Sequence, residues 1–173
     1  WCSLCLSLPR SDPRNSRAKH LIAELTQAFR DLAKDAAVRV AVLAANGQSF
    51  SAGADLDWMK RMSAMGRAEN ERDAMALAAL MEAIDRCPKP VVGMIQGAAF
   101  GGGVGLVACC DIAIASSGAS FSLSEVRLGL IPAVISPYVA AAIGPRACRR
   151  YFLTAERFDA AKTKAVPGVR HVV

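Results

Sequence analysis

Short apolar runs that are typical of buried strands alternate along this chain with segments of helical period. Residues 38–45 form a nearly continuous run of β-branched residues and alanine, and residues 91–95 form another. Such runs are typical of parallel strands that are covered on both faces. A helix is predicted before each run by apolar residues at helical spacing, which are Leu21, Leu25, Ala28, Phe29 and Leu32 in the first and Leu77, Leu80, Met81 and Ile84 in the second. The alternation predicts an α/β domain with a largely parallel sheet.

The pattern continues with shorter elements. Residues 101–110 predict a helix of small residues, residues 111–115 a third strand, and residues 120–123 a short extended piece. Ser136 followed by Pro137 predicts another helix, with the serine as its N-cap and the proline at its first helical position. We see no repeat or linker, so a single domain over residues 1–173 is expected.

Composition narrows the class of protein. Of the 173 residues 53% are hydrophobic and 21% charged, which suits a globular core that buries roughly two thirds of the unfolded surface. No apolar run approaches the ~20 residues of a membrane-spanning helix, and no basic stretch precedes the apolar start. A cytoplasmic protein without membrane contact is expected. The start at Trp1 and the end at Val173, straight after an apolar run, suggest a fragment.

The cysteines and histidines predict neither a redox centre nor a metal site. Six cysteines are scattered among apolar neighbours, which favours reduced thiols over a disulfide scaffold. Cys2 and Cys5 have C-x-x-C spacing, but the redox motif needs a strand before it and a helix after it, and here Pro9 follows. The two histidines, His20 and His171, lack the spacing of zinc ligands.

Two glycine-bearing segments, residues 51–56 and 97–103, each follow a predicted strand and lead towards a helix. Such a turn presents bare backbone N–H groups, and two of them brought together would hold one developing oxyanion. Without a Cβ at Gly101 or Gly102, an acyl group could approach the backbone closely. The competing interpretation is that the small residues only let the helix pack tightly on the sheet.

Residues 103–108 also match the G-x-G-x-x-G/A fingerprint of dinucleotide-binding proteins, and Glu125 lies where a ribose-binding acid might be sought. In that fold the first glycine directly follows the strand, whereas residues 97–102 intervene here. Asp111 and Glu125 also miss the end of the following strand, where the ribose-binding acid belongs. A dehydrogenase is therefore the weaker interpretation.

Three motifs follow one another in the chain. They are Phe-Ser-Ala-Gly-Ala-Asp-Leu at 50–56, the glycine segment 97–103 with Cys-Asp-Ile-Ala-Ile-Ala at 110–115, and Phe-Ser-Leu-Ser-Glu at 121–125 with Gly-Leu-Ile-Pro at 129–132. In this order and spacing they resemble the enoyl-CoA hydratase/isomerase (crotonase) family, from about residue 18 to the end of the chain. The resemblance implies a crotonase-like ββα spiral core of class α/β, with largely parallel sheets flanked by helices. It also implies a C-terminally truncated chain that lacks the family's helical trimerisation region.

The resemblance further implies roles for individual residues. The backbone N–H groups of Ala54 and Gly102 would form an oxyanion hole for the thioester carbonyl of a coenzyme A substrate, and Glu125 would transfer protons. Contacts to the substrate are implied for Ala52, Asp55, Leu56, Trp58, Met59, Phe100, Gly101, Ile131, Pro132, Ala133, Ile135 and Tyr138. Coenzyme A is part of the substrate, so no separate cofactor is expected.

The acid–base machinery departs from the family pattern. Enoyl-CoA hydratases commonly use two glutamates, and the first would fall at Gly105, where this chain has no carboxylate. Adding water needs a base and an acid, whereas moving a double bond needs one shuttling group. The apolar run 128–134 beside Glu125 predicts a raised pKa and a catalytic role for it, with a solvated acid or an ion pair to Arg127 as the alternative.

The residue sequences of these motifs resemble those of a bacterial branch of methylglutaconyl-CoA or isohexenylglutaconyl-CoA hydratases, whose members also carry glycine at the position of Gly105. Substrates of that branch are branched enoyl thioesters with a distal carboxylate. The main hypothesis is therefore a lyase that hydrates a branched 2-enoyl-CoA. A Δ3-Δ2 enoyl-CoA isomerase that uses the single glutamate and an inactive truncated relative are the alternatives.

The net charge of +6 is unevenly placed. Residues 146–170 contain seven lysines and arginines against Glu156 and Asp159, which favours anionic ligands, although a solvated helical face is the plainer interpretation. RNA binding stays an alternative, but aromatic residues are 6% of the chain and do not interleave with the basic ones. The expected partners are an acyl-CoA thioester and, as the resemblance implies for the full-length protein, further copies of the chain in a homotrimer or a dimer of trimers.

Overall fold

The structure is a computed structural model that describes residues 3–8, 19–53, 65–163 and 171–172. Its larger sheet has five strands in the order β1-β2-β3-β5-β8, and every neighbouring pair is parallel. The strands are β1 (Ser3–Leu8), β2 (Val40–Ala45), β3 (Val91–Ile95), β5 (Ile112–Ala115) and β8 (His171–Val172). The prediction of an α/β fold with largely parallel strands is therefore confirmed.

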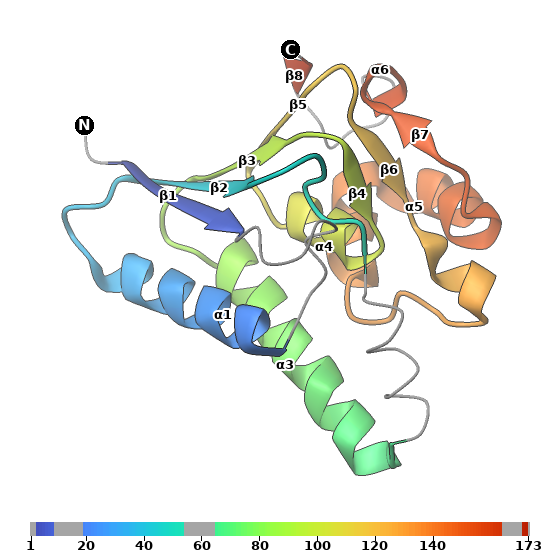
Figure 1. Ribbon diagram of the computed structural model, residues 1–173, viewed down its shortest axis with the longest axis horizontal. Helices are drawn as coiled ribbons and strands as arrows, with labels where there is room; N and C mark the ends of the chain where they lie inside the picture. The colour runs from blue at the N-terminus through green and yellow to red at the C-terminus, as the bar shows by residue number, and fades with distance from the viewer. Residues whose placement is uncertain (1–2, 9–18, 54–64, 164–170, 173) are drawn as a thin grey trace.

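A smaller sheet begins where β3 ends. Its strands are β4 (Ala98–Phe100), β6 (Ser120–Ser122) and β7 (Phe158–Asp159), of which β4 and β6 are parallel and β6 and β7 antiparallel. Only Gln96 and Gly97 separate β3 from β4, so the chain passes directly from one sheet into the other (Figure 1). The rings of Phe121 and Phe158 stack on the core side with their centroids 5.5 Å apart.

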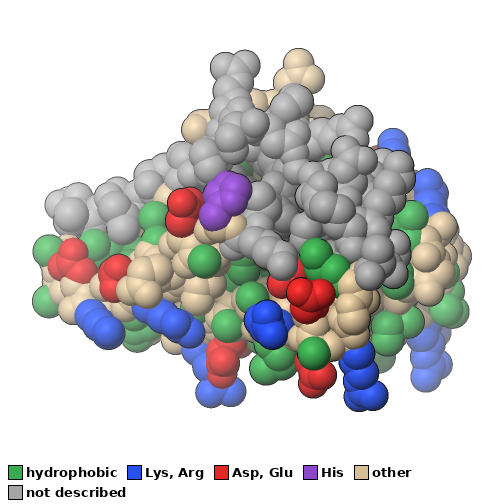
Figure 2. Space-filling view, turned by 60° about the horizontal axis from the view of Figure 1, so that its bottom comes forward, with side chains coloured by type: hydrophobic (Ala, Val, Ile, Leu, Met, Phe, Trp, Pro, Cys, Tyr) green, Lys and Arg blue, Asp and Glu red, His purple; other side chains and the backbone are tan. Residues whose placement is uncertain are grey.

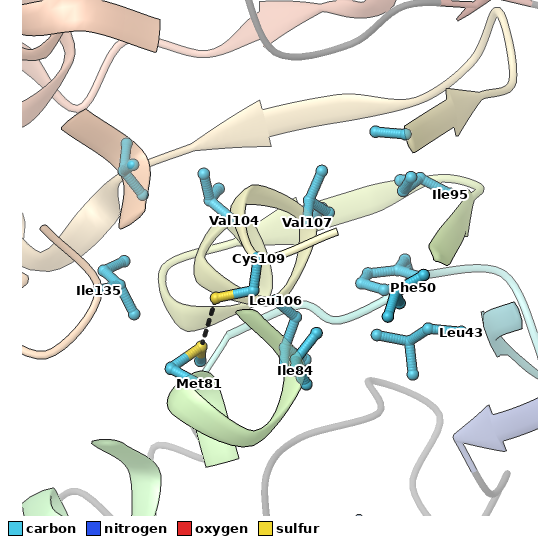
Figure 3. Close-up of a cluster of buried hydrophobic side chains, with 14 of the residues drawn as sticks. Leu43, Phe50, Met81, Ile84, Ile95, Val104, Leu106, Val107, Cys109 and Ile135 are labelled. Carbon is cyan, nitrogen blue, oxygen red and sulfur yellow. Dashed lines mark hydrogen bonds between the residues drawn. The ribbon is translucent and has the colours of Figure 1, made fainter. Parts of the chain in front are cut away.

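Two long helices, α1 (Lys19–Lys34) and α3 (Arg67–Asp85), pack together on one side of the larger sheet (Figure 1). Both bury the apolar positions that predicted them, such as Phe29 and Leu80. The short helix α4 (Gly102–Ala108) lies among side chains from α3 and the sheet, including Met81 and Leu43 (Figure 3). No helix in the part of the chain that the structure describes is both long and apolar enough to cross a membrane.

After β6 the chain forms a 3₁₀ helix, η1 (Ser124–Leu128), then α5 (Ser136–Thr154) and α6 (Ala160–Thr163). The prediction that Ser136 caps α5 is wrong, because Ile135 is the N-cap and Ser136 is already helical. The Ser136 N–H donates to the Pro132 carbonyl, and its hydroxyl donates to the Ala133 carbonyl. A turn that ends in Ile135 has thus begun the helix before the serine, and Pro137 takes the second helical position.

Candidate active site

The structure places residues 51–53, the described part of the first glycine segment, beside the second segment. Ser51 forms a parallel bridge with Ala99, its N–H donates to the Ala98 carbonyl over 2.9 Å, and its own carbonyl accepts from the N–H of Phe100 over 2.8 Å. A Cβ on Gly103 would lie 2.8 Å from the Ser51 carbonyl oxygen and 2.9 Å from the Ser51 Cβ. A side chain at Gly103 would therefore push α4 away from the other turn.

Gly101 turns the chain from β4 into α4. Its backbone angles, φ 54° and ψ −123°, belong to a region that is almost restricted to glycine. The Gly101 N–H donates to the Ser122 carbonyl over 2.8 Å, which fixes the turn to the smaller sheet. Gly102 is the first helical residue, so α4 itself offers no acceptor to its N–H. The predicted helix of residues 101–110 is shorter than expected because Gly101 serves as its N-cap and Cys109 as its C-cap.

Glu125 lies beside this turn. Its Oε1 is 3.0 Å from the position that a Cβ would take on Gly101, and its Oε2 is buried. The residue sits in η1, which ends at Gly129 in the left-handed conformation with φ 68°. The neighbouring Arg127 donates a hydrogen bond to the Ala155 carbonyl over 3.2 Å. The structure thus places one carboxylate against the turn that presents the Gly102 N–H.

The space beside Gly105 is filled by other side chains. A Cβ on Gly105 would lie 2.8 Å from the Ile135 Cβ and closer still to the Ile135 Cγ2, with the Met81 Cε at 3.2 Å. Ile135 is buried at the start of α5 and faces α4 (Figure 3). An acidic side chain at position 105 has no room in this packing, so Gly105 is required by the contact between α4 and α5.

The other residues predicted to contact the substrate differ in how far they are buried. Ala52, Phe100, Pro132 and Tyr138 are half-buried, and Gly101 is buried, whereas Ile131 is 80% exposed and Ala133 is also exposed. Tyr138 packs against the core cluster, and burial, followed by the nearby Cys109 and then the acidic side chains Asp85 and Glu82 of α3, raises the pKa of its hydroxyl. Ala54, Asp55, Leu56, Trp58 and Met59 lie outside the described residues, so their roles stay predictions.

Two contacts at the site could not be predicted from the sequence. The guanidinium of Arg157 lies over the ring of Phe100, 4.9 Å from its centroid. The Ala155 carbonyl accepts the Arg127 bond and a second one from the Ser122 hydroxyl, at 3.1 Å. Both contacts join segments that lie far apart in the chain, and the pairing of β6 with β4 and with β7 helps to bring them together.

Among the residues that the structure describes, the remaining reactive side chains do not form a second centre. Burial raises the pKa of Cys110 to about 12, and burial followed by the neighbouring Cys110 raises the pKa of Cys109 further. Cys5 lies inside β1, and Cys2 lies outside the described residues. Within the ranges that the structure describes, no group of histidine, cysteine and acidic side chains could hold a metal ion.

The basic residues near the C-terminal end are dispersed. Arg150 donates two hydrogen bonds to Glu156, over 2.7 and 2.9 Å, and this bonding holds the Glu156 pKa below its ordinary value. Arg146, Arg149 and Lys162 are exposed. On the face shown in Figure 2, lysines and arginines alternate with acidic and apolar side chains and form no continuous basic patch.

The parallel five-stranded sheet that continues into a smaller mixed sheet, the glycine turn and the adjoining carboxylate define a crotonase-like α/β protein. The chain belongs to the enoyl-CoA hydratase/isomerase family, whose model matches residues 4–173. An enoyl-CoA hydratase from Shewanella pealeana, solved as a crystal structure, is 48% identical and superposes with a TM-score of 0.96 over 99% of this chain and 64% of its own.

Two relatives known from sequence agree with this assignment. The enoyl-CoA hydratase AKT6-1 of Alternaria alternata is 38% identical over 166 residues, which are 96% of this chain and 53% of the relative. The crotonyl-CoA hydratase of Syntrophomonas wolfei is 32% identical over 170 residues, which are 97% of this chain and 64% of the relative. The chain thus spans between about half and two thirds of the length of these relatives.

Proposed function

We propose that the full-length protein hydrates a branched 2-enoyl-CoA thioester. The observation that carries the proposal is the Glu125 carboxylate next to Gly101, beside the helix start that presents the Gly102 N–H. In this proposal the thioester oxygen accepts hydrogen bonds from the N–H groups of Gly102 and Ala54. Negative charge develops on that oxygen as water adds to the β-carbon, and each such donor contributes a factor of about 10²–10³ to the rate.

Glu125 carries both proton transfers in this scheme. Its carboxylate takes a proton from water while the water oxygen bonds to the β-carbon, and the resulting enolate then receives a proton at the α-carbon from the same carboxyl group. The charge balances, because Glu125 begins and ends ionised. The packing of Ile135 against Gly105 supports a single-carboxylate scheme, since it leaves no room for an acidic side chain at position 105.

The same packing also favours a second candidate, a Δ3-Δ2 enoyl-CoA isomerase. One base suffices there, because Glu125 would take a proton from C2, next to the thioester carbonyl, and return it to C4, the far carbon of the original C3=C4 double bond, which leaves the double bond between C2 and C3. The dienolate between these steps needs the same oxyanion donors. Hydration stays the first proposal because the relatives reported above are described as hydratases.

The resemblance to the methylglutaconyl-CoA and isohexenylglutaconyl-CoA hydratases supports a branched acyl chain with a distal carboxylate. We also propose a cytoplasmic homotrimer or dimer of trimers for the full-length protein, in line with the family pattern. Sedimentation of the full-length protein measures this directly: a monomer at working concentration would contradict the proposed assembly and leave the chemistry untouched.

The decisive experiment incubates the full-length protein with a panel of straight and branched enoyl-CoA thioesters and identifies the products by mass spectrometry. Hydration adds the mass of water, whereas isomerisation leaves the mass unchanged and moves the double bond. Glu125→Gln should lower kcat by about 10²–10⁴-fold. Glu82→Gln, an exposed glutamate of α3, is the matched control and should leave kcat unchanged. The proposal fails if Glu125→Gln keeps the wild-type rate or if no thioester reacts.

A further inference from the structure

Ala155 has an unusual backbone conformation for its residue type. With φ 50° and ψ 26° it is the one non-glycine residue of positive φ in the described part of the chain. It caps the C-terminal end of α5 and is completely buried. A left-handed conformation is unfavourable for an L-residue with a Cβ, and it persists where the surrounding structure holds it in place.

The surrounding structure uses the carbonyl that this conformation presents. The Ala155 oxygen accepts one hydrogen bond from the Ser122 hydroxyl at 3.1 Å and another from the Arg127 guanidinium at 3.2 Å. Ser122 precedes Glu125 by three residues and Arg127 follows it by two. The two donors therefore bracket Glu125 and tie both sides of its segment to one acceptor.

The hydrogen bonds around Ser122 also reach the glycine turn at Gly101. The Ser122 carbonyl accepts the Gly101 N–H at 2.8 Å, so Ser122 contacts the glycine turn with its backbone and Ala155 with its side chain. None of the five residues of η1 is buried, and Val126 and Leu128 are 39% and 50% exposed. Only Ser124 and Glu125 of η1 are half-buried, so hydrogen bonds that tether the segment add to this limited packing in fixing its position.

We propose that Ser122, Arg127 and the Ala155 carbonyl form a positioning group that holds the Glu125 carboxylate against the Gly101 turn. This inference rests on the proposed role of Glu125 in proton transfer. None of the three residues need touch the substrate, since they act through the placement of η1. Displacement of a catalytic group by about 1 Å can cost about 10²-fold in rate, so loss of one tether should slow the reaction without weakening substrate binding.

The test uses the full-length protein and the variants Arg127→Met and Ser122→Ala. Arg127→Met removes the donor but keeps a long side chain, and Arg127→Lys returns a donor. We expect kcat to fall about 10–100-fold in Arg127→Met, with KM within about twofold of the wild type, and Arg127→Lys to recover most of the loss. Arg86→Met is the matched control and should leave both constants unchanged, because Arg86 is an exposed arginine at the C-cap of α3, paired with Glu82.

A second measurement does not depend on turnover. The side-chain carboxyl of Glu125, labelled with ¹³C, is titrated by NMR in the wild type, Arg127→Met and Ser122→Ala. We expect its midpoint to move in both variants and to stay in Arg86→Met. Unchanged midpoints in both variants would overturn the inference, as would unchanged kcat in both while Glu125→Gln is inactive. If the wild type turns over no thioester, the proposed function fails, and the titration still decides whether the tethers place Glu125.

Discussion

Replacing Gly105 by alanine should destabilise the protein, although the same change in an ordinary helix interior stabilises it by about 0.5–1 kcal/mol. The new Cβ would lie 2.8 Å from the Ile135 Cβ and closer to its Cγ2, and 3.2 Å from the Met81 Cε. Met81 can rotate away, but Ile135 is buried and β-branched, with little rotamer freedom. Overpacking of this kind costs about 1–3 kcal/mol, so the net loss should be about 1–2 kcal/mol.

Urea unfolding followed by far-UV circular dichroism measures this change, provided the slope with denaturant stays constant. Gly118→Ala is the matched control, because a Cβ there meets no atom within 4 Å, and it should change the free energy of unfolding by less than about 0.5 kcal/mol. Ile135→Ala removes the Cγ2, which makes the closest contact, and keeps only the Cβ at 2.8 Å, so in that background Gly105→Ala should cost clearly less than in the wild type, with a coupling energy of about 1–2 kcal/mol. A Gly105→Ala protein as stable as the wild type, with no coupling to position 135, would refute the packing argument.

Two further predictions follow from the same structure. Gly103→Ala should lower kcat by at least about tenfold, because its Cβ would meet the Ser51 carbonyl at 2.8 Å and separate the two turns; steady-state kinetics of a soluble variant checks this. The thiols of Cys109 and Cys110 should resist alkylation at pH 8 until urea unfolds the protein. Folding raises the pKa of both thiols above the ordinary 9.0, so the free energy of unfolding should fall as the pH rises above 9, by at most about 1.4 kcal/mol per pH unit for each thiol. Urea unfolding at several pH values measures this, and a free energy of unfolding that stays constant above pH 9 would contradict the prediction.

Much of the fold follows from the apolar pattern. The strand predicted at residues 91–95 agrees with β3, and the run at 38–45 contains β2, which begins at Val40 because Val38 still belongs to the turn after α1. Asp111, predicted as the first residue of a strand, lies just outside β5, where its carboxylate accepts the Val91 N–H at 2.8 Å. Long helices and strands bury enough apolar residues for the hydrophobic period to predict them, whereas the residues at which they begin and end depend on local hydrogen bonds.

Other features could not be predicted from the pattern. The strands β4 and β7 contain three and two residues, too few for a period to emerge, whereas β6 lies within the extended piece predicted at residues 120–123. The clash that excludes a side chain at Gly105 comes from Ile135, thirty residues along the chain, and the left-handed conformation of Ala155 occurs without a glycine. The clash at Gly105 and the conformation of Ala155 both depend on which distant segments the tertiary fold places in contact, and the secondary-structure propensity of single residues does not predict such contacts.

The meeting of the two glycine turns, in contrast, follows from the order of the strands. The strands β2 and β3 are parallel neighbours, so the segments that leave their carboxyl ends emerge side by side. Gln96, at the end of β3, holds them there, because its side-chain amide donates to the Ala45 carbonyl at 2.7 Å and its own carbonyl accepts the Phe50 N–H at 2.8 Å. Parallel neighbouring strands in this order can therefore place two such turns together. What the turns can do chemically depends on the side chains that face them, and among the residues that the structure describes the Glu125 carboxylate lies against the Gly101 turn.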